Sequence, residues 1–115
     1  MASEKRTRVE IFLPVRTDTA IYRIVTDWLS EELALARGGS TLTTPFTGLY
    51  ASTNMGSGVV RDQIQILFCD FDLDTDNPAH LGILLSYLND LRLILMEILH
   101  EEDVWIIHHS ITRIL

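Results

Sequence analysis

The sequence predicts an α+β domain in which two helices cover one face of a four-stranded antiparallel sheet. Apolar residues recur at spacings of three and four over residues 21–36 and again over residues 81–98, which is the period of an amphipathic helix. Residues 9–13 and 59–69 are instead rich in β-branched residues and alternate in character, as strands do. With the Thr-rich stretch 40–53 and the end of the chain, the order is strand, helix, strand, strand, helix, strand.

Length and composition restrict the class of protein. The chain has 115 residues, of which 47% are hydrophobic, so we expect one domain with a substantial core. The net charge of −7 argues against a nucleic-acid partner, because phosphate contacts need clustered Lys and Arg. The N-terminus is polar, no apolar run approaches the roughly 20 residues that span a bilayer, and the single Cys69 fits a reducing compartment. We therefore expect a cytoplasmic protein with no membrane and no nucleic-acid partner.

The first strand is predicted over residues 8–15. Residues 1–7 are expected to be a disordered tail in front of a single domain that spans residues 8–115. Val9, Ile11 and Leu13 share one face of the strand, because side chains alternate with a period of two. Pro14 has no backbone N–H and should end the pairing.

The first helix is predicted to follow an N-cap at Thr17 or Asp18. Its apolar stripe consists of Ile21, Ile24, Val25, Trp28, Leu29, Leu33 and Ala36. Arg37 lies in the last turn, where the helix dipole favours a cation. Gly38 can adopt the left-handed conformation that often ends a helix.

The next two strands are predicted to form a hairpin. Residues 40–53 form an exposed strand interrupted by Pro45 and Gly48, and residues 54–58 form the turn. Residues 59–69 are the clearest strand of the chain. One face of that strand is wholly apolar and is expected to meet the helices; its residues are Ile64, Ile66 and Phe68.

The second helix is predicted to begin at a cap formed by Asp76 or Asn77, with Pro78 in its first turn. It is apolar over more than the one stripe that a two-layer fold needs. The last strand, residues 104–115, starts with apolar residues on both faces. Both features predict a second buried contact, most simply with another copy of the chain. The complete order is β-α-β-β-α-β, the ferredoxin-like arrangement.

The layout from Gly48 onward resembles that of the PII-like proteins, and most of all their CutA branch. The shared features are Gly48-Leu49-Tyr50 at a strand end, Gly56-Ser57-Gly58 at the hairpin tip, Asp62 before an apolar strand, and Glu101-Glu102-Asp103 before the last strand. Gly38-Gly39-Ser40-Thr41 stands where that branch has a Cys-containing segment, and the tip is shorter than a PII signalling loop. The resemblance implies a homotrimer whose sheets pack into a central barrel, with ligand clefts between subunits.

Two stretches could bind an anion. Gly38-Gly39-Ser40-Thr41 could offer backbone N–H groups and two hydroxyls, although it lacks the spacing and Lys of a P-loop and also fits a helix stop followed by a turn. A polar cluster across the hairpin could hold a carboxylate or phosphate, and its members are Tyr50, Thr53, Arg61 and Asp62. A solvated cross-strand salt bridge is the plainer interpretation of that cluster.

No metal site or cofactor is predicted. An acidic stretch resembles the start of a Ca²⁺ loop but lacks the Gly and Glu of an EF-hand, and it also fits a helix cap; it contains Asp70, Asp72, Asp74 and Asp76. His108 and His109 are adjacent on a strand, so they point to opposite faces and cannot chelate one ion together. Cys69 has no neighbouring His or second Cys and is interpreted as a buried, inert thiol.

These features favour a non-enzymatic, homo-oligomeric module of PII-like build that binds a small anionic or metal ligand between subunits. A trimer is expected rather than a dimer. The candidate ligand-binding residues are Gly39, Ser40, Thr41, Tyr50, Arg61, Asp62 and His108. One alternative is an enzyme of the dimeric α+β barrel class acting on a small apolar substrate, for which His108, His109 and Trp105 would be tested. Another is an assembly module with no ligand.

Overall fold

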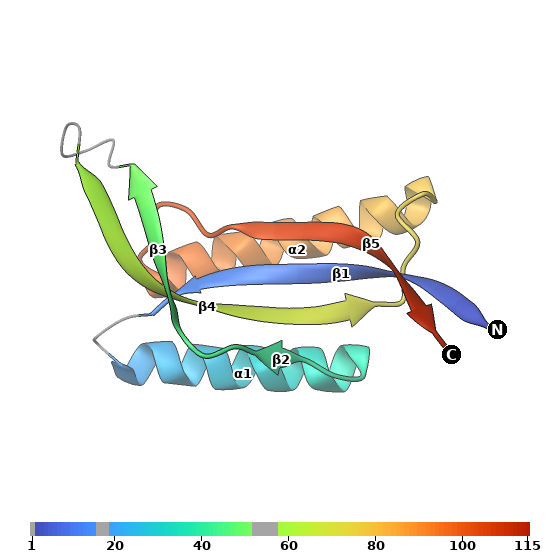
Figure 1. The fold of residues 1–115 in the computed structure, drawn as a ribbon, viewed down its shortest axis with the longest axis horizontal. Coiled ribbons are helices and arrows are strands. Elements are labelled where there is room, and N and C mark those ends of the chain that lie inside the picture. The colour runs from blue at the N-terminus through green and yellow to red at the C-terminus, as the bar shows by residue number, and fades with distance from the viewer. Residues whose placement is uncertain (1, 16–18, 52–57) are drawn as a thin grey trace.

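The computed structural model describes residues 2–15, 19–51 and 58–115. It is an α+β fold with two helices and a five-stranded antiparallel sheet (Figure 1). In chain order the elements are β1 Ser3–Pro14, α1 Thr19–Arg37, β2 Thr41–Leu42, β3 Phe46–Ala51, β4 Val59–Phe71, α2 Pro78–Leu99 and β5 Ile106–Ile114. Neither helix is long and apolar enough to cross a membrane within the described part of the chain.

The sheet is built around β1 and β4. These two strands pair with each other, β5 pairs with the free side of β1, and both β2 and β3 pair with the other side of β4. The predicted interruption of the second strand at Pro45 is confirmed, because β2 ends at Leu42 and β3 begins at Phe46. Gly48 does not interrupt the pairing; it lies within β3, opposite Asp62.

The N-terminal residues belong to the sheet. We expected a disordered tail over residues 1–7, but β1 begins at Ser3, which is opposite Ile114 of β5. The polar sequence of this segment fits a strand because Ser3 and Lys5 are exposed, and Glu4 and Arg6 are only partly buried and pair with each other. Thr7 is the exception: it is fully buried, and its hydroxyl donates to the Leu73 carbonyl at 2.8 Å.

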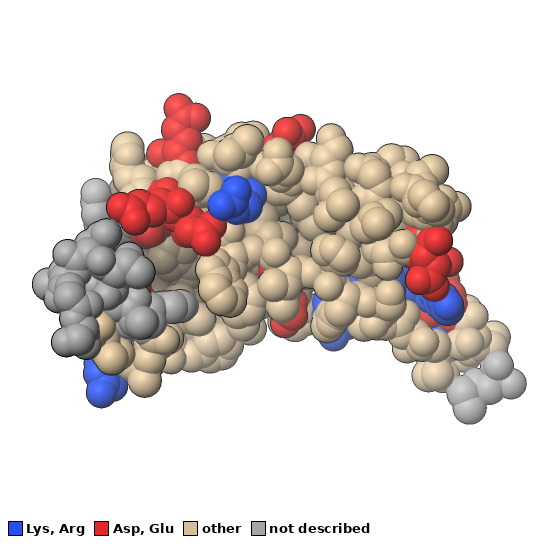
Figure 2. All heavy atoms as spheres, turned by 90° about the horizontal axis from the view of Figure 1, so that it is seen from above, with Lys and Arg blue, Asp and Glu red and all other residues tan. Residues whose placement is uncertain are grey.

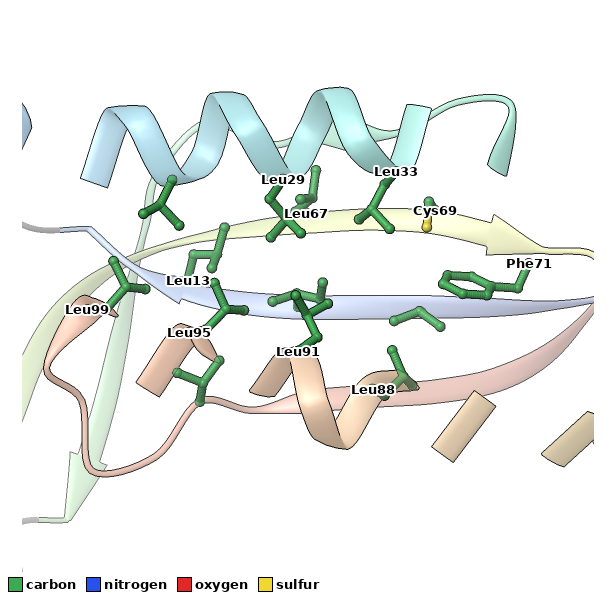
Figure 3. Packing of buried hydrophobic residues seen from close by; sticks show 14 of the residues in the cluster. Leu13, Leu29, Leu33, Leu67, Cys69, Phe71, Leu88, Leu91, Leu95 and Leu99 are labelled. Atoms are coloured by element: carbon green, nitrogen blue, oxygen red, sulfur yellow. The ribbon is translucent and has the colours of Figure 1, made fainter. Parts of the chain in front are cut away.

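One face of the sheet carries the core. Val9, Ile11 and Leu13 of β1 are at most 1% exposed, as their spacing predicted. The face predicted for β4 is wrong, because the residues of that strand that meet the helices are Leu67, Cys69 and Phe71 (Figure 3). The register explains the choice: residues directly opposite each other share a face, and the pairs include Val9 with Cys69 and Ile11 with Leu67. The residues expected there, Ile64, Ile66 and Phe68, lie half-buried on the open face.

A glutamine on the helix-facing side made the true core face of β4 look polar. Gln65 is opposite Leu13, and its amide is satisfied there. The Tyr22 hydroxyl donates to Gln65 Oε1 at 2.8 Å, and Gln65 Nε2 donates to the Thr43 carbonyl at 2.9 Å. A half-buried amide with both groups bonded is tolerated beside a core.

Both helices cover the same sheet face. The cap predicted for α1 at Thr17 or Asp18 lies outside the described residues, whereas the start of α2 and the end of α1 match the sequence. Asn77 caps α2 by accepting hydrogen bonds from the backbone N–H groups of Ala79 and His80. Gly38 follows α1 with a φ of 89°, the left-handed conformation expected after Arg37. The buried side chains of the two helices point into one shared cluster with the sheet (Figure 3).

Candidate anion-binding site

The open face of the sheet is divided into an apolar end and a charged end. On β1, Phe12 lies at the apolar end beside Ile66, and Glu10 lies between Phe68 and Ile107. Further along the strand, Arg8 lies between Asp70 and His109. The charged end adjoins the loop that leaves α1, because β2 pairs with the same stretch of β4.

A cavity of about 300 Å³ lies at this charged end. Four arginines line it, and they come from both ends of the chain and from α1: Arg6, Arg8, Arg37 and Arg113. The remaining lining residues are the loop Gly38, Gly39, Ser40 and Thr41 together with Phe68, Cys69 and Asp70 of β4. The volume is at the lower end of the range for small-molecule sites.

The Arg8–Asp70 pair fixes one wall of the cavity. Arg8 donates to both carboxylate oxygens, from Nε to Oδ1 at 2.8 Å and from Nη2 to Oδ2 at 3.0 Å. This two-pronged bond lowers the pKa of Asp70 and raises the pKa of Arg8. The same guanidinium carbon lies 5.3 Å from the centre of the Phe68 ring, so an aromatic face also borders the cavity.

Two further arginines share one carboxylate. Arg6 Nε lies 2.9 Å from Glu4 Oε1, and Arg113 Nη1 lies 3.4 Å from the same oxygen. Glu4 therefore neutralises one of these two charges and leaves the other uncompensated. Glu10 is also near enough to Arg8 for its charge to contribute to the raised pKa of that guanidinium, so four arginines against three carboxylates leave an excess of one positive charge around the cavity.

Arg37, the fourth arginine of the cavity, forms no ion pair with a carboxylate of the described residues. Its guanidinium carbon lies 4.3 Å from the centre of the Phe71 ring and 5.4 Å from that of Tyr87, so aromatic stacking fixes it instead of an ion pair. Its Nε is buried without a hydrogen-bond partner among the described residues. The donors that remain for a ligand are the Nη groups, which form one edge of a planar fork suited to carboxylate or phosphate.

The loop after α1 lies beside these arginines. The Ser40 hydroxyl donates to the Ser30 carbonyl at 2.8 Å, which ties the loop back to α1. At Gly39 a Cβ atom would meet nothing within 4 Å, so the backbone there is open to the cavity. Of the residues that the sequence singled out, Gly39, Ser40 and Thr41 are the ones that the structure gathers with basic groups.

The hairpin candidates are not part of this cavity. Asp62 is opposite Gly48 and Arg61 is opposite Leu49, at the other end of β4. Both side chains are exposed, and as neighbours on a strand they point to opposite faces. Tyr50 is opposite Val60 in the ladder, whereas its side chain and residue Thr53 lie outside the part that the structure describes.

The histidines are also separate from the cavity. His108 is opposite Val9 and is exposed on the helix-facing side of β5, whereas His109 is on the open face with its Nε2 3.9 Å from Glu10 Oε2. His80 Nδ1 accepts the backbone N–H of Asp74 at 3.0 Å. Over residues 2–15, 19–51 and 58–115, no group of three or more His, Cys, Asp or Glu side chains could hold a metal ion.

Cys69 lies beneath the cavity as part of the core. It is 4% exposed, and burial, with a smaller contribution from the charge of Asp70, raises its pKa to about 11. The thiol is therefore protonated at neutral pH and is not a nucleophile.

Sequence reasoning missed all four arginines of the cavity. They are spread along the chain at positions 6, 8, 37 and 113, and only the pairing of β1 with β4 and β5 brings them together. One usable signal was present: Arg6 and Arg8 are two residues apart, so they share a face if the segment is a strand.

Comparison with known proteins identifies a fold and no family. No known family and no curated protein matches the sequence. Among solved structures the chain is similar to a phage SAM lyase in complex with S-methyl-5'-thioadenosine. The two share 15% sequence identity over 94% of this chain and 90% of that one, with a TM-score of 0.55. At this identity the likeness shows the fold alone.

Proposed function

We propose that the chain is a homo-oligomeric module that binds a small anionic ligand in the arginine-lined cavity. The observation that carries this proposal is Arg37, whose guanidinium is fixed by Phe71 and Tyr87 and has no carboxylate within ion-pair distance among the described residues. A charged group held in place without a counter-charge binds an anion at little cost in side-chain entropy. The site keeps the predicted loop residues Gly39, Ser40 and Thr41 and replaces the hairpin residues with arginines.

The architecture we propose for this module is ferredoxin-like with PII-like assembly. The ferredoxin-like architecture is supported by the strand order, which is β5-β1-β4 followed by β2 and β3. All pairs are antiparallel and both helices lie on one face. The PII-like assembly is supported by the apolar end of the open sheet face, since Trp105 is 62% exposed and Ile107 is 41% exposed there. A neighbouring subunit would cover this end, and a trimer is the arrangement we propose.

Calorimetric titration with inorganic phosphate and with citrate, at low ionic strength, tests the site. Arg37→Ala should weaken binding about 10- to 100-fold, because hydrogen bonds to charged groups contribute about 1.5–3 kcal/mol. Arg37→Lys should lose part of the affinity, because it keeps the charge and loses the planar fork. Arg61→Ala is the matched control and should leave affinity unchanged, since Arg61 is exposed at the opposite end of β4. Equal losses in Arg37→Ala and Arg61→Ala would reject the cavity as the site.

A second candidate is binding or cleavage of SAM, favoured by the fold likeness to the phage SAM lyase. SAM carries a carboxylate that suits Arg37 and an adenine that suits the ring of Phe68 at the cavity wall. Titrations with SAM and with S-methyl-5'-thioadenosine separate the contribution of the carboxylate from that of the adenine, because only SAM has the carboxylate. Mass spectrometry of SAM incubated with the protein would detect S-methyl-5'-thioadenosine if the chain is a lyase. No product and no binding of either compound would remove this candidate and leave the first one standing.

The dimeric barrel enzyme remains a further alternative for the same open face. Trp105 and His109 lie on the open face, whereas His108 lies on the helix-facing side of β5 and does not. Native mass spectrometry distinguishes the barrel enzyme from the PII-like module, because a dimer favours the first hypothesis and a trimer favours the second.

A further inference from the structure

β5 is an edge strand with only one paired side. Residues 106–114 pair with β1 in one unbroken register, and no strand of the described residues pairs with the other side (Figure 1). Phe12 N–H donates to the Trp105 carbonyl at 2.9 Å, and Leu115 N–H donates to the Ala2 carbonyl at 3.0 Å, so the odd-numbered residues along β5 bond toward β1. The backbone groups of the even-numbered residues therefore point outward along this free edge: Ile106, His108, Ser110, Thr112 and Ile114.

The free edge of β5 lacks the features that usually prevent an exposed strand from pairing. Residues 106–114 contain no Pro, Lys, Asp or Glu, and their register with β1 has no bulge. An edge of this kind is a template for another strand. The strand that adds to it must match both its outward backbone groups and its exposed side chains.

The two ends of β5 carry apolar surfaces that complement each other. At the end of the strand, Ile114 is 64% exposed and Leu115 is 61% exposed. At its start there is a cavity of about 260 Å³, lined by residues of α2 and of the segment that leads into β5: Arg92, Asp103, Val104, Trp105, Ile106 and Ile107. Because α2 and β5 line this cavity, and β1 pairs with the opposite side of β5, the cavity borders the free edge.

A second copy of β5 fits this edge in a register centred on Ser110. When two copies run antiparallel with Ser110 opposite Ser110, every even-numbered residue faces an even-numbered residue, so the outward N–H and C=O groups find partners. The same register places Ile114 of each copy opposite Ile106 of the other, and Leu115 opposite Trp105. The exposed apolar end of each strand then lies at the cavity of the other copy.

The charges around β5 agree with this register. Arg113 would lie opposite Ile107, and His108 opposite Thr112, so no like charges oppose each other. Figure 2 looks onto the side of the molecule where α2 and β5 lie at the top of Figure 1, and most of that surface is uncharged. Depletion of charged residues is typical of the centre of protein interfaces.

We propose that the free edge of β5 joins two copies of the chain about a two-fold axis at Ser110, so that the sheet continues from one copy into the other. A two-fold contact uses the same patch on both copies, and β5 meets this condition because the cavity and the residues that cover it lie at opposite ends of one strand. This contact goes beyond the anion site and uses the edge of the sheet, whereas the proposed trimer uses its open face. The edge contact alone gives a dimer and both contacts together give a hexamer, so the assembly is even-numbered.

Cysteine cross-linking tests the register. In Ser110→Cys the two introduced thiols lie opposite each other, with Cα atoms about 5.5 Å apart, a distance that a disulfide spans. Thr112→Cys is the matched control, because Thr112 is also exposed and on the same face of β5, but its two copies are offset along the strands by about 13 Å. Mild oxidation should link Ser110→Cys into a covalent dimer and leave Thr112→Cys unlinked. The wild type should also stay unlinked, since Cys69 is 4% exposed.

Native mass spectrometry tests the apolar contact at the ends of β5. The wild type should be even-numbered, and Ile114→Asp should fall to monomers or trimers, because each contact would bury a carboxylate from both copies. Ile114 is exposed in the single chain, so the fold should survive this change. Val59→Asp, at a residue of β4 that is 67% exposed, is the control and should stay even-numbered.

Four results would overturn the proposal. They are a wild-type monomer or trimer, no cross-link in Ser110→Cys, equal cross-linking of the two cysteine variants, and an Ile114→Asp variant that stays even-numbered. The last result is the one expected of a dimer formed through the open sheet faces, because Ile114 lies on the helix-facing side of β5.

Discussion

The two ends of β4 carry similar residues and form different structures. At the hairpin end Arg61 and Asp62 are neighbours in sequence, but they lie on opposite faces of the strand and both are exposed. At the other end Asp70 bonds twice to Arg8, a residue 62 positions away. Strand register, rather than closeness in sequence, therefore assembles the polar site. The charged cavity is at the end of β4 where three strands and the α1 loop meet.

The largest difference between the two ends should appear in stability. Phe71 is 1% exposed and contacts both Tyr87 and Arg37, so Phe71→Ala should lower the free energy of unfolding by about 3–5 kcal/mol. Val59, at the hairpin end, is 67% exposed, and Val59→Ala should change it by no more than about 0.5 kcal/mol. Urea denaturation of both variants measures the contrast. Similar losses would mean that the two ends are equally packed.

The next effect concerns the aspartates at the two ends. Asp70→Asn should cost about 1 kcal/mol, because the pair with Arg8 is doubly hydrogen-bonded but about one-third exposed to solvent. Asp62→Asn should cost almost nothing, since Asp62 is exposed. Chemical denaturation at neutral pH compares the two, and an equal cost would show that the Arg8 bond adds nothing to stability.

The smallest effect is the pH dependence of that same pair. The Arg8 bond lowers the pKa of Asp70 from its ordinary value of 3.8, so the folded protein binds this proton less readily than the unfolded chain. The contribution of Asp70 to stability is therefore full above about pH 4 and is lost as the pH falls through the lowered pKa. The stability gap between wild type and Asp70→Asn should stay constant from pH 7 to 5 and close in acid. A stability gap that widens in acid would mean that folding raises the pKa of Asp70 instead of lowering it.

The fold was predictable where one pattern dominated. The helices, the cap at Asn77, the Gly38 termination and the break at Pro45 all follow from local chemistry that a sequence displays directly. The face of β4 was not predictable, because Gln65 makes the core face look polar. Its amide is satisfied by Tyr22 of α1 and by Thr43 between β2 and β3, contacts that the sequence of β4 does not show. Residues 3–7 form a strand because they pair with β5, which comes from the other end of the chain, so their own sequence does not show it.

The candidate site was less predictable than the fold. The loop Gly39-Ser40-Thr41 was identified by its composition, but its basic neighbours are Arg6, Arg8, Arg37 and Arg113, which only the strand register brings beside it. Arg37 was interpreted as a helix-end cation, and its role at the cavity depends on the rings of Phe71 and Tyr87. No local pattern encodes such long-range contacts.

The most direct test of the cavity is amide chemical-shift mapping of the ¹⁵N-labelled protein during titration with inorganic phosphate. The proposal predicts that the shifts concentrate at Gly38, Gly39, Ser40 and Thr41 and at Asp70, while the amides of Val59 to Asp62 stay unchanged. Arg37→Ala should remove the phosphate-dependent shifts, and its spectrum without phosphate should differ from that of the wild type only around residues 37, 71 and 87. Shifts that concentrate at Val59 to Asp62, or that persist in Arg37→Ala, would contradict the assignment of the anion site to the arginine-lined cavity.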